Sequence, residues 1–146
     1  MPSELATPEQ RPAMLRAHYA AENANDMERI MATFSGDTEM LFNRHAFRDH
    51  GGIRAAHEHL GFGAAGAFRG VQAIRDREHV TADEIVVEGR LCGRHVGELQ
   101  GFAPTQRDVE LPFVAFYRFD ASGKLVSERV VMNLSPLAHA ATSAAP

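Results

Sequence analysis

The sequence predicts a single α+β domain in which helices come first and a long antiparallel sheet follows. Hydrophobic residues recur every three to four positions over much of residues 12–60, which is typical of helices that bury one face. From residue 71 onward the period changes to two, and β-branched and aromatic residues become frequent, as expected of strands. Helices that precede the strands, instead of alternating with them, indicate the α+β class.

Length and composition limit the possible functions. The 146 residues, 45% of them hydrophobic, suffice for one domain over residues 1–146, with flexible tails expected at 1–11 and 138–146. The net charge is −4 and the Lys and Arg residues are scattered, which argues against nucleic acid or an anionic membrane as a partner. No segment reads as a signal peptide or a membrane span, so we expect a cytoplasmic protein.

Cys92 is the only cysteine, which excludes an intrachain disulfide and a cysteine-based zinc cluster. We expect it to be a small apolar residue of a strand.

Two helices are predicted near the start of the chain. The first covers residues 12–23, with Leu15, Tyr19 and Glu22 on one face, so Tyr19 is expected to point inward. His18 can lie on either side of that face. The second starts with Asp26 as its N-cap and ends at Gly36. Its apolar stripe consists of Met27, Ile30, Met31 and Phe34.

A short strand over residues 39–42 and a third helix over residues 52–60 follow. The third helix has Ile53, Ala56, His57 and Leu60 on one face. The glycine-rich segment 61–68 lacks the strand, loop and helix pattern of a phosphate-binding loop. We interpret it as a lid or wall in which Phe62 and Phe68 cover a cavity.

The last two strands form a hairpin around the turn at residues 120–123. Pairing of Phe119 with Lys124 places Ala115 and Val130 on one face of this hairpin. The same face carries Phe113, Tyr117, Val126, Glu128 and Met132. The other face mixes apolar and polar side chains and suits a subunit contact; it carries Val114, Phe116, Arg118, Ser127, Arg129, Val131 and Asn133.

Three short motifs carry a resemblance to a known family: Gly-Arg-His-Val-Gly-Glu at 93–98, Gly-Phe-Ala-Pro-Thr at 101–105 and Gly-Lys-Leu at 123–125. With the order of the elements, they resemble the SnoaL-like polyketide cyclases and ester cyclases of the nuclear transport factor 2-like superfamily. The resemblance implies a cone-shaped, curved sheet closed by N-terminal helices, the cystatin-like α+β barrel. It also implies a homodimer through the outer face of the sheet.

The resemblance does not carry over the family's acid/base pair. In the polyketide cyclases, an Asp on the last strand and a His on the preceding strand move the protons of an aldol ring closure. These positions correspond to Val130 and Ala115, neither of which can transfer a proton. A further Asp of many relatives corresponds to Asn133, whereas a Tyr of the first helix is retained as Tyr19.

Glu128, His57 and Tyr19 are therefore the candidate catalytic residues. Glu128 lies among apolar neighbours, which would raise its pKa toward that of a general base; alternatively it pairs with Arg90 or Arg94. His57 lies on an apolar helix face, where it is either a proton carrier or a core histidine with satisfied hydrogen bonds. Tyr19 would orient or polarise a substrate oxygen.

No metal and no cofactor are predicted. His45, Asp49, His50, His57 and His59 lie close in sequence, but only His45 and Asp49 have a spacing that aims both side chains at one ion. His95 belongs to a turn of the family pattern, where structural hydrogen bonding is the simpler interpretation.

Two functions from different classes follow. The first is a cofactor-independent acid/base enzyme, of cyclase, isomerase, hydrolase or dehydratase type, that acts on a small hydrophobic carbonyl or polyketide-like compound. The second is a non-catalytic binder of such a ligand in the same cone. In both, the predicted pocket residues are Phe62, Phe68, Phe113, Tyr117, Val130, Met132, His95 and Asn133.

Overall fold

The computed structural model describes residues 10–63 and 66–138. The predictions that concern the first nine residues, positions 64–65 of the glycine-rich segment and the final eight residues therefore lie outside it. The helices are α1 (Gln10–Asn23), α2 (Met27–Ala32) and α3 (Asp49–Leu60). The strands are β1 (Phe34–Phe42), β2 (His45–Arg48), β3 (Phe68–Val80), β4 (Ile85–His95), β5 (Asp108–Phe119) and β6 (Leu125–Met132).

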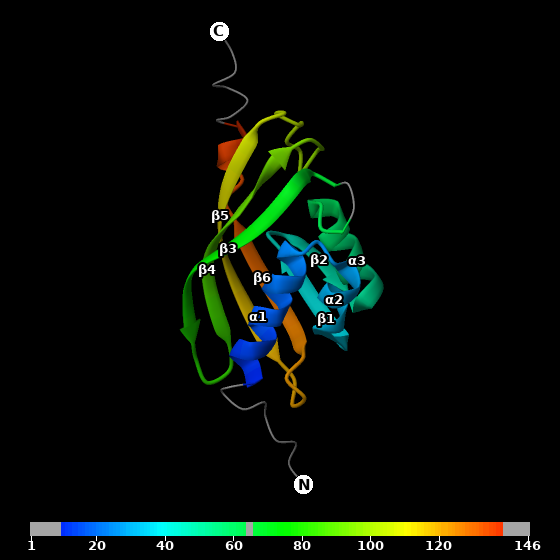
Figure 1. Cartoon of the computed structure of the whole chain (residues 1–146), viewed down its shortest axis with the longest axis vertical. Helices are drawn as coiled ribbons and strands as arrows, with labels where there is room; N and C mark the ends of the chain where they lie inside the picture. Colours follow the sequence, from blue (N-terminus) through cyan, green and yellow to red (C-terminus); the bar gives the residue numbers. More distant parts are fainter. Residues whose placement is uncertain (1–9, 64–65, 139–146) are drawn as a thin grey trace.

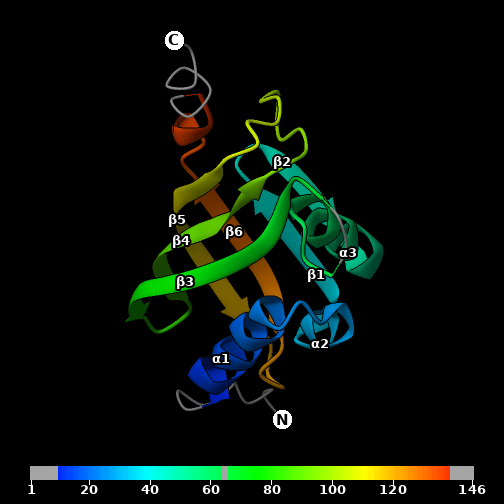
Figure 2. The same ribbon diagram turned by 45° about the horizontal axis from the view of Figure 1, so that its top comes forward.

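The six strands form one curved, unclosed sheet in the order β2-β1-β6-β5-β4-β3. All neighbours are antiparallel except β1 and β6, which run parallel. The three helices gather on one side of this sheet (Figures 1 and 2). The α+β class is confirmed, and the core lies between the helices and the inner face of the sheet.

The curvature of the sheet has local causes. The register of β3 against β4 shifts twice, between Arg69 and Gln72 and between Arg75 and Arg77, and such bulges bend a strand. Gly89 lies on β4, where a Cβ would be 2.7 Å from Phe113 Cζ, so the missing side chain lets Phe113 pack close to the bend.

The second helix is shorter than predicted. Asp26 caps it by accepting a hydrogen bond from the Arg29 N–H at 3.2 Å, but the helix ends at Ala32, not at Gly36. Phe34, expected on the helical stripe, instead begins β1 and pairs with Leu125. Pairing with a distant strand has overridden the local helical pattern.

The first helix begins at Gln10, so residues 10 and 11 belong to α1 and not to a tail. Arg11 is anchored because its Nη1 donates to the carbonyl oxygens of Thr81 and Ala82 at 3.3 and 3.2 Å. Strand β2 was not predicted, and α3 starts at Asp49, three residues earlier than expected.

The β5–β6 hairpin keeps the predicted faces with one correction. Ala115 pairs with Val130 and Tyr117 with Glu128, but Phe119 pairs with Leu125 instead of Lys124. Asp120 accepts hydrogen bonds from the backbone of Ser122 and Lys124, which widens the turn and shifts the register by one residue. Consequently Leu125, not Val126, is fully buried at this end of the hairpin.

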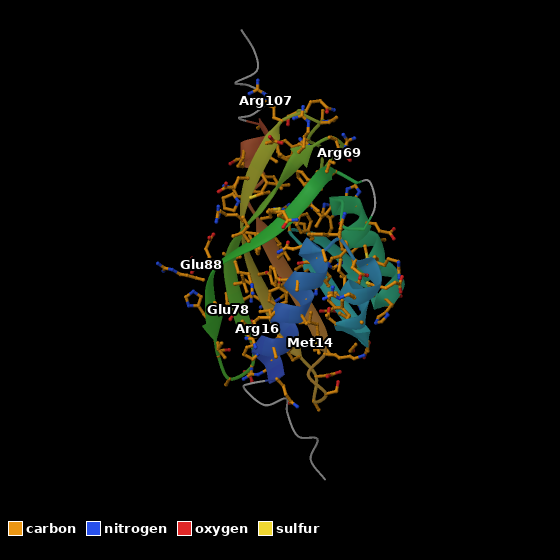
Figure 3. All side chains as sticks on the ribbon, viewed as in Figure 1. Met14, Arg16, Arg69, Glu78, Glu88 and Arg107 are labelled. Atoms are coloured by element: carbon orange, nitrogen blue, oxygen red, sulfur yellow. The ribbon has the colours of Figure 1, made fainter. Side chains whose placement is uncertain are left out.

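The exposed side chain of Glu88 on β4 points away from the body of the protein (Figure 3). The outer face of β6 exposes Val131, which is 62% accessible, and Arg129 lies over the Phe116 ring at 4.8 Å. A homodimer through this face remains a prediction. None of the described helices is long and apolar enough to span a membrane.

Candidate active site

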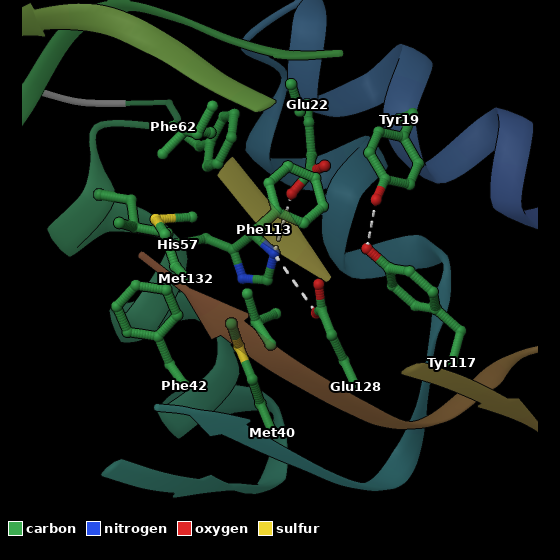
Figure 4. Close-up of a pocket in the computed structure, with 14 residues that line it drawn as sticks. Tyr19, Glu22, Met40, Phe42, His57, Phe62, Phe113, Tyr117, Glu128 and Met132 are labelled. Carbon is green, nitrogen blue, oxygen red and sulfur yellow. Dashed lines mark hydrogen bonds and ion pairs between the residues drawn. The ribbon is translucent and has the colours of Figure 1, made fainter. Parts of the chain in front are cut away.

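Four ionisable side chains meet in the core, where helices α1 and α3 face strand β6. His18 and Glu22 come from α1, His57 from α3 and Glu128 from β6. All four are at most 5% exposed. Figure 4 shows Glu22, His57 and Glu128 pointing toward one another. We call these four residues the buried cluster.

The cluster residues of α1 and α3 lie on the buried faces of their helices because of the helical spacing of each sequence. His18 and Glu22 are four residues apart on α1, so they share the face that also buries Leu15. On α3, the buried positions are Ile53, Ala56, His57 and Leu60, as predicted. Glu128 is directly opposite Tyr117 in the hairpin.

The distances within the cluster are longer than those of hydrogen-bonded ion pairs. Glu22 Oε2 lies 3.5 Å from His18 Nε2 and 3.4 Å from His57 Nε2. Glu128 lies 3.9 Å from His18 Nε2 and 4.0 Å from His57 Nε2. Charge-assisted hydrogen bonds are usually about 2.7–2.9 Å long. The two Nε2 atoms and Glu128 Oε2 are buried without a hydrogen-bond partner.

A hydrogen bond at Nδ1 fixes the orientation of each imidazole ring. His57 Nδ1 lies 2.8 Å from the Ile53 carbonyl oxygen, which only accepts, so Nδ1 carries a proton. His18 Nδ1 lies 2.9 Å from Thr33 Oγ1, whose own hydrogen is donated to the Ile30 carbonyl at 2.6 Å. His18 Nδ1 is therefore also a donor, and both rings turn Nε2 toward the carboxylates.

The electrostatics of Glu22 and His57 are coupled. Burial alone would raise the pKa of Glu22, but the charges of His18 and His57 outweigh it and lower this pKa to about 2. Burial would likewise lower the pKa of His57, but Glu22 and Glu128 outweigh it and raise this pKa to about 9. Glu22 is thus an anion at neutral pH and His57 a cation.

Glu128 differs from Glu22. Burial, together with the charge of Glu22, raises the pKa of Glu128 despite the opposing influence of His18 and His57. The alternative of an arginine partner is wrong. Arg90 pairs with Asp76 and Glu110, and Arg94 lies near Asp108.

A pair of tyrosines adjoins the cluster. Tyr19 and Tyr117 share a hydrogen bond of 2.6 Å between their hydroxyls, and both are nearly fully buried. The inward orientation predicted for Tyr19 is confirmed. Burial raises the pKa of both hydroxyls well above 10, and the neighbouring carboxylates add to this.

These are the only two tyrosines in the chain, so their ionisation can be followed by ultraviolet absorbance. We expect the folded protein to show no tyrosinate signal near pH 10, where tyrosines of an unfolded chain are half ionised. Since the raised pKa favours the neutral hydroxyl in the folded state, stability falls as the pH rises above about 10.

The control for this titration is the same protein in denaturant, which should titrate near pH 10. Titration of one tyrosine near pH 10 in the folded protein would contradict the buried pair.

Tyr19 and Tyr117 line a cavity of about 30 Å³, room for about one or two waters. Glu22, His57 and Glu128 line it together with apolar side chains. Of the predicted pocket residues, those at the cavity are Phe62, Phe113, Tyr117, Val130 and Met132.

The other three predicted pocket residues lie elsewhere. Phe68 stacks against the ring of His95 with centroids 5.4 Å apart, and neither residue lines the cavity. His95 Nδ1 accepts a hydrogen bond from the Thr105 N–H at 3.2 Å, which is the structural interpretation given above. Asn133 is exposed and caps the Ser135 N–H, because it follows the end of β6.

The sequence contained a signal for the two cluster residues that had no predicted role. Glu22 was placed on the apolar face of the first helix, where a carboxylate needs a buried partner. His18, four residues earlier, is within reach of it. The two facts together predict a His–Glu pair, but not its meeting with His57 and Glu128.

Of the histidines that lie close in sequence, His45, His50 and His59 are on the surface. His45 and His59 line an outer groove, and His50 Nε2 lies 2.9 Å from the Ser35 carbonyl oxygen. Asp49 caps its own helix by accepting from the Gly52 N–H. Asp49 therefore stabilises its helix. Among the described residues, the group with a geometry that could hold a metal ion is the buried cluster and not His45 with Asp49.

The outer groove, with a volume of about 470 Å³, shares a wall with the cavity. Met40, Phe42 and Leu60 line both, so these side chains lie between the cavity and the outer groove.

The chain belongs to the SnoaL-like domain family, which it matches over residues 15–128. The membership predicted from the glycine-containing motifs is confirmed. No curated protein matches the chain.

Solved structures show the same fold at low identity. A candidate SnoaL-like polyketide cyclase from Jannaschia sp. CCS1 has a TM-score of 0.78 and 20% identity, covering 100% of this chain and 96% of that one. A candidate hydroxylase from Streptomyces galilaeus has a TM-score of 0.76 and 23% identity, covering 94% and 98%. A candidate polyketide cyclase, IdmH from Streptomyces antibioticus, has a TM-score of 0.73 and 18% identity, covering 90% and 97%.

Proposed function

We propose that this protein is an enzyme that moves protons on a small hydrophobic carbonyl compound, as in a cyclase or isomerase. The observation that carries the proposal is the buried cluster at the edge of an otherwise apolar cavity. Buried ionisable groups cost stability, and they are retained where chemistry needs them. The relatives described as cyclases are consistent with this class of reaction.

The positions of the side chains suggest a division of roles. Glu128, whose pKa is raised, would take a proton from the carbon next to the carbonyl. The electrons of the broken C–H bond would move to the carbonyl oxygen, which would accept a hydrogen bond from the free O–H of the Tyr19–Tyr117 pair. The cationic His57 would return a proton to the product oxygen. Glu128 would thereby replace the family's aldol Asp, whose position here is Val130.

A substrate can enter the cavity only if the side chains shared with the outer groove, Met40, Phe42 and Leu60, move. A cavity of about 30 Å³ is smaller than the roughly 300–1,000 Å³ of small-molecule sites, whereas the outer groove falls in that range. Side-chain rotation of Met40 or Phe42 would join the two spaces.

A direct test uses 2-tetralone, an apolar ketone, and follows exchange of its α-protons with deuterated water by NMR. We expect exchange above the buffer rate with the native protein, and about a tenfold lower rate after Tyr19→Phe, because the hydrogen-bonded tyrosine pair that donates to the enolate oxygen is broken. If 2-tetralone binds saturably but the exchange rate equals that of buffer, the protein is the non-catalytic binder and this proposal fails.

Entry of substrate from the outer groove can be tested separately. Phe42→Ala should connect groove and cavity and raise kcat/KM for bulky ketones relative to small ones. Phe47→Ala is the matched control, because Phe47 lines only the groove. Equal effects of the two variants on this ratio would contradict entry through the shared wall.

A further inference from the structure

We infer that the buried cluster is a binding site for one first-row divalent transition metal ion, such as Zn²⁺ or Co²⁺. The ligands would be His18 Nε2, His57 Nε2 and one carboxylate oxygen each from Glu22 and Glu128. This inference goes beyond the proposed function, which needs no metal.

The donor atoms surround one point. The four ligand atoms all lie within 4.8 Å of one another. In a tetrahedral site with bonds of about 2.0–2.1 Å, neighbouring ligand atoms are about 3.4 Å apart. Glu22 Oε2 lies 3.4 and 3.5 Å from the two Nε2 atoms, which is this spacing. Glu128 Oε1 lies 3.9 Å from His18 Nε2 and Glu128 Oε2 lies 4.0 Å from His57 Nε2, so the carboxylate would move inward to bring one oxygen onto the ion.

Both histidines have the hydrogen-bond arrangement that is typical of metal-binding histidines. Such a histidine presents one bare ring nitrogen and donates from the other to a fixed oxygen. Here the Ile53 carbonyl holds His57 Nδ1 and the Thr33 hydroxyl holds His18 Nδ1. Both Nε2 atoms and Glu128 Oε2 are buried without a hydrogen-bond partner. A bound ion would replace the Nε2 proton of the cationic His57, because a metal-binding imidazole must be neutral.

The charges also balance. Once binding has released the Nε2 proton of His57, two carboxylates and two neutral imidazoles carry a charge of −2, which one divalent ion neutralises. The mixture of imidazole and carboxylate donors favours first-row transition metals over Mg²⁺ or Ca²⁺, which prefer oxygen ligands alone. Glu22, His57 and Glu128 also line the cavity, so a bound ion would act there as a Lewis acid beside any small molecule.

The test is titration of the full chain, after removal of metals with a chelator, with Zn²⁺ by calorimetry and with Co²⁺ by visible absorbance. We expect one ion per chain, and at least a 100-fold lower affinity for Mg²⁺ and Ca²⁺. Glu22→Gln and His57→Gln should each weaken Zn²⁺ binding by more than 100-fold. His45→Ala and His59→Ala, on the outer groove, are controls that should leave it unchanged.

Thr33 serves as a positioning residue in this site. Thr33→Val removes the oxygen that fixes His18 and should weaken Zn²⁺ binding about 10–100-fold, whereas Thr33→Ser should restore it. X-ray absorption of the zinc-loaded native chain should show two imidazoles per ion, a readout that does not depend on whether a variant folds.

The inference is overturned if neither Zn²⁺ nor Co²⁺ binds, if binding survives Glu22→Gln and His57→Gln, or if X-ray absorption finds no imidazole ligand. These measurements need no substrate. Failure to bind metal therefore leaves the exchange result of the chelator-treated chain unaffected, and the two proposals can fail separately.

Discussion

The Glu22→Gln variant is expected to lose about 3–5 kcal/mol of unfolding free energy, because the change leaves buried positive charge without its partner. In the native chain, Glu22 Oε2 is the carboxylate oxygen closest to both histidines, at 3.5 and 3.4 Å. Chemical denaturation of the chelator-treated protein at neutral pH measures the loss.

The matched control is Glu28→Gln, the same substitution at an exposed ion pair. Glu28 lies 2.6 Å from Arg54, but its side chain is 82% exposed, so we expect a change below about 1 kcal/mol. Equal stability losses in the two variants would mean that His57 carries no charge for Glu22 to balance.

The second large effect is expected on turnover. Glu128→Gln keeps the size of the side chain but removes the proton acceptor, so the rate of α-proton exchange should fall by about 10²–10⁴-fold. The change should appear in kcat with KM nearly constant, because Glu128 is assigned to the chemical step. The measurement is steady-state exchange on the chelator-treated chain.

Val126→Gln provides the comparison for Glu128→Gln, because Val126 lies on the same strand but lines no part of the cavity. A wild-type rate in Glu128→Gln would remove Glu128 from the mechanism, and the acid/base role would have to pass to Glu22 or His57.

Local patterns were sufficient for much of the fold. The apolar stripe of α3 placed His57 inward, and the period-two pattern of the hairpin put Glu128 on the buried face. Both inferences depend only on side-chain periodicity, which the tertiary structure preserved. The end of α2 was not predictable in this way, because Phe34 pairs with Leu125, a residue far along the chain.

The site was predictable only in part for a related reason. Periodicity says that a side chain is buried, but not which buried side chains meet. The sequence did not determine whether the side chain of His18 points into the core. Its contacts with Thr33 and the cluster depend on how α1 packs against α2 and the sheet. Similarly, the sequence left open whether Glu128 meets Arg90 or Arg94 or lies among apolar neighbours, and it did not predict the meeting of Glu128 with His57 of α3.

The central claim is that the buried cluster exists for chemistry and not for stability. The most direct test is the exchange assay on a chain in which the cluster is made apolar by His18→Leu, Glu22→Met, His57→Leu and Glu128→Met together. Apolar replacement of buried ion pairs is often neutral or stabilising, so we expect a folded protein with no exchange above buffer. A folded variant that exchanges 2-tetralone protons at the native rate would contradict the claim.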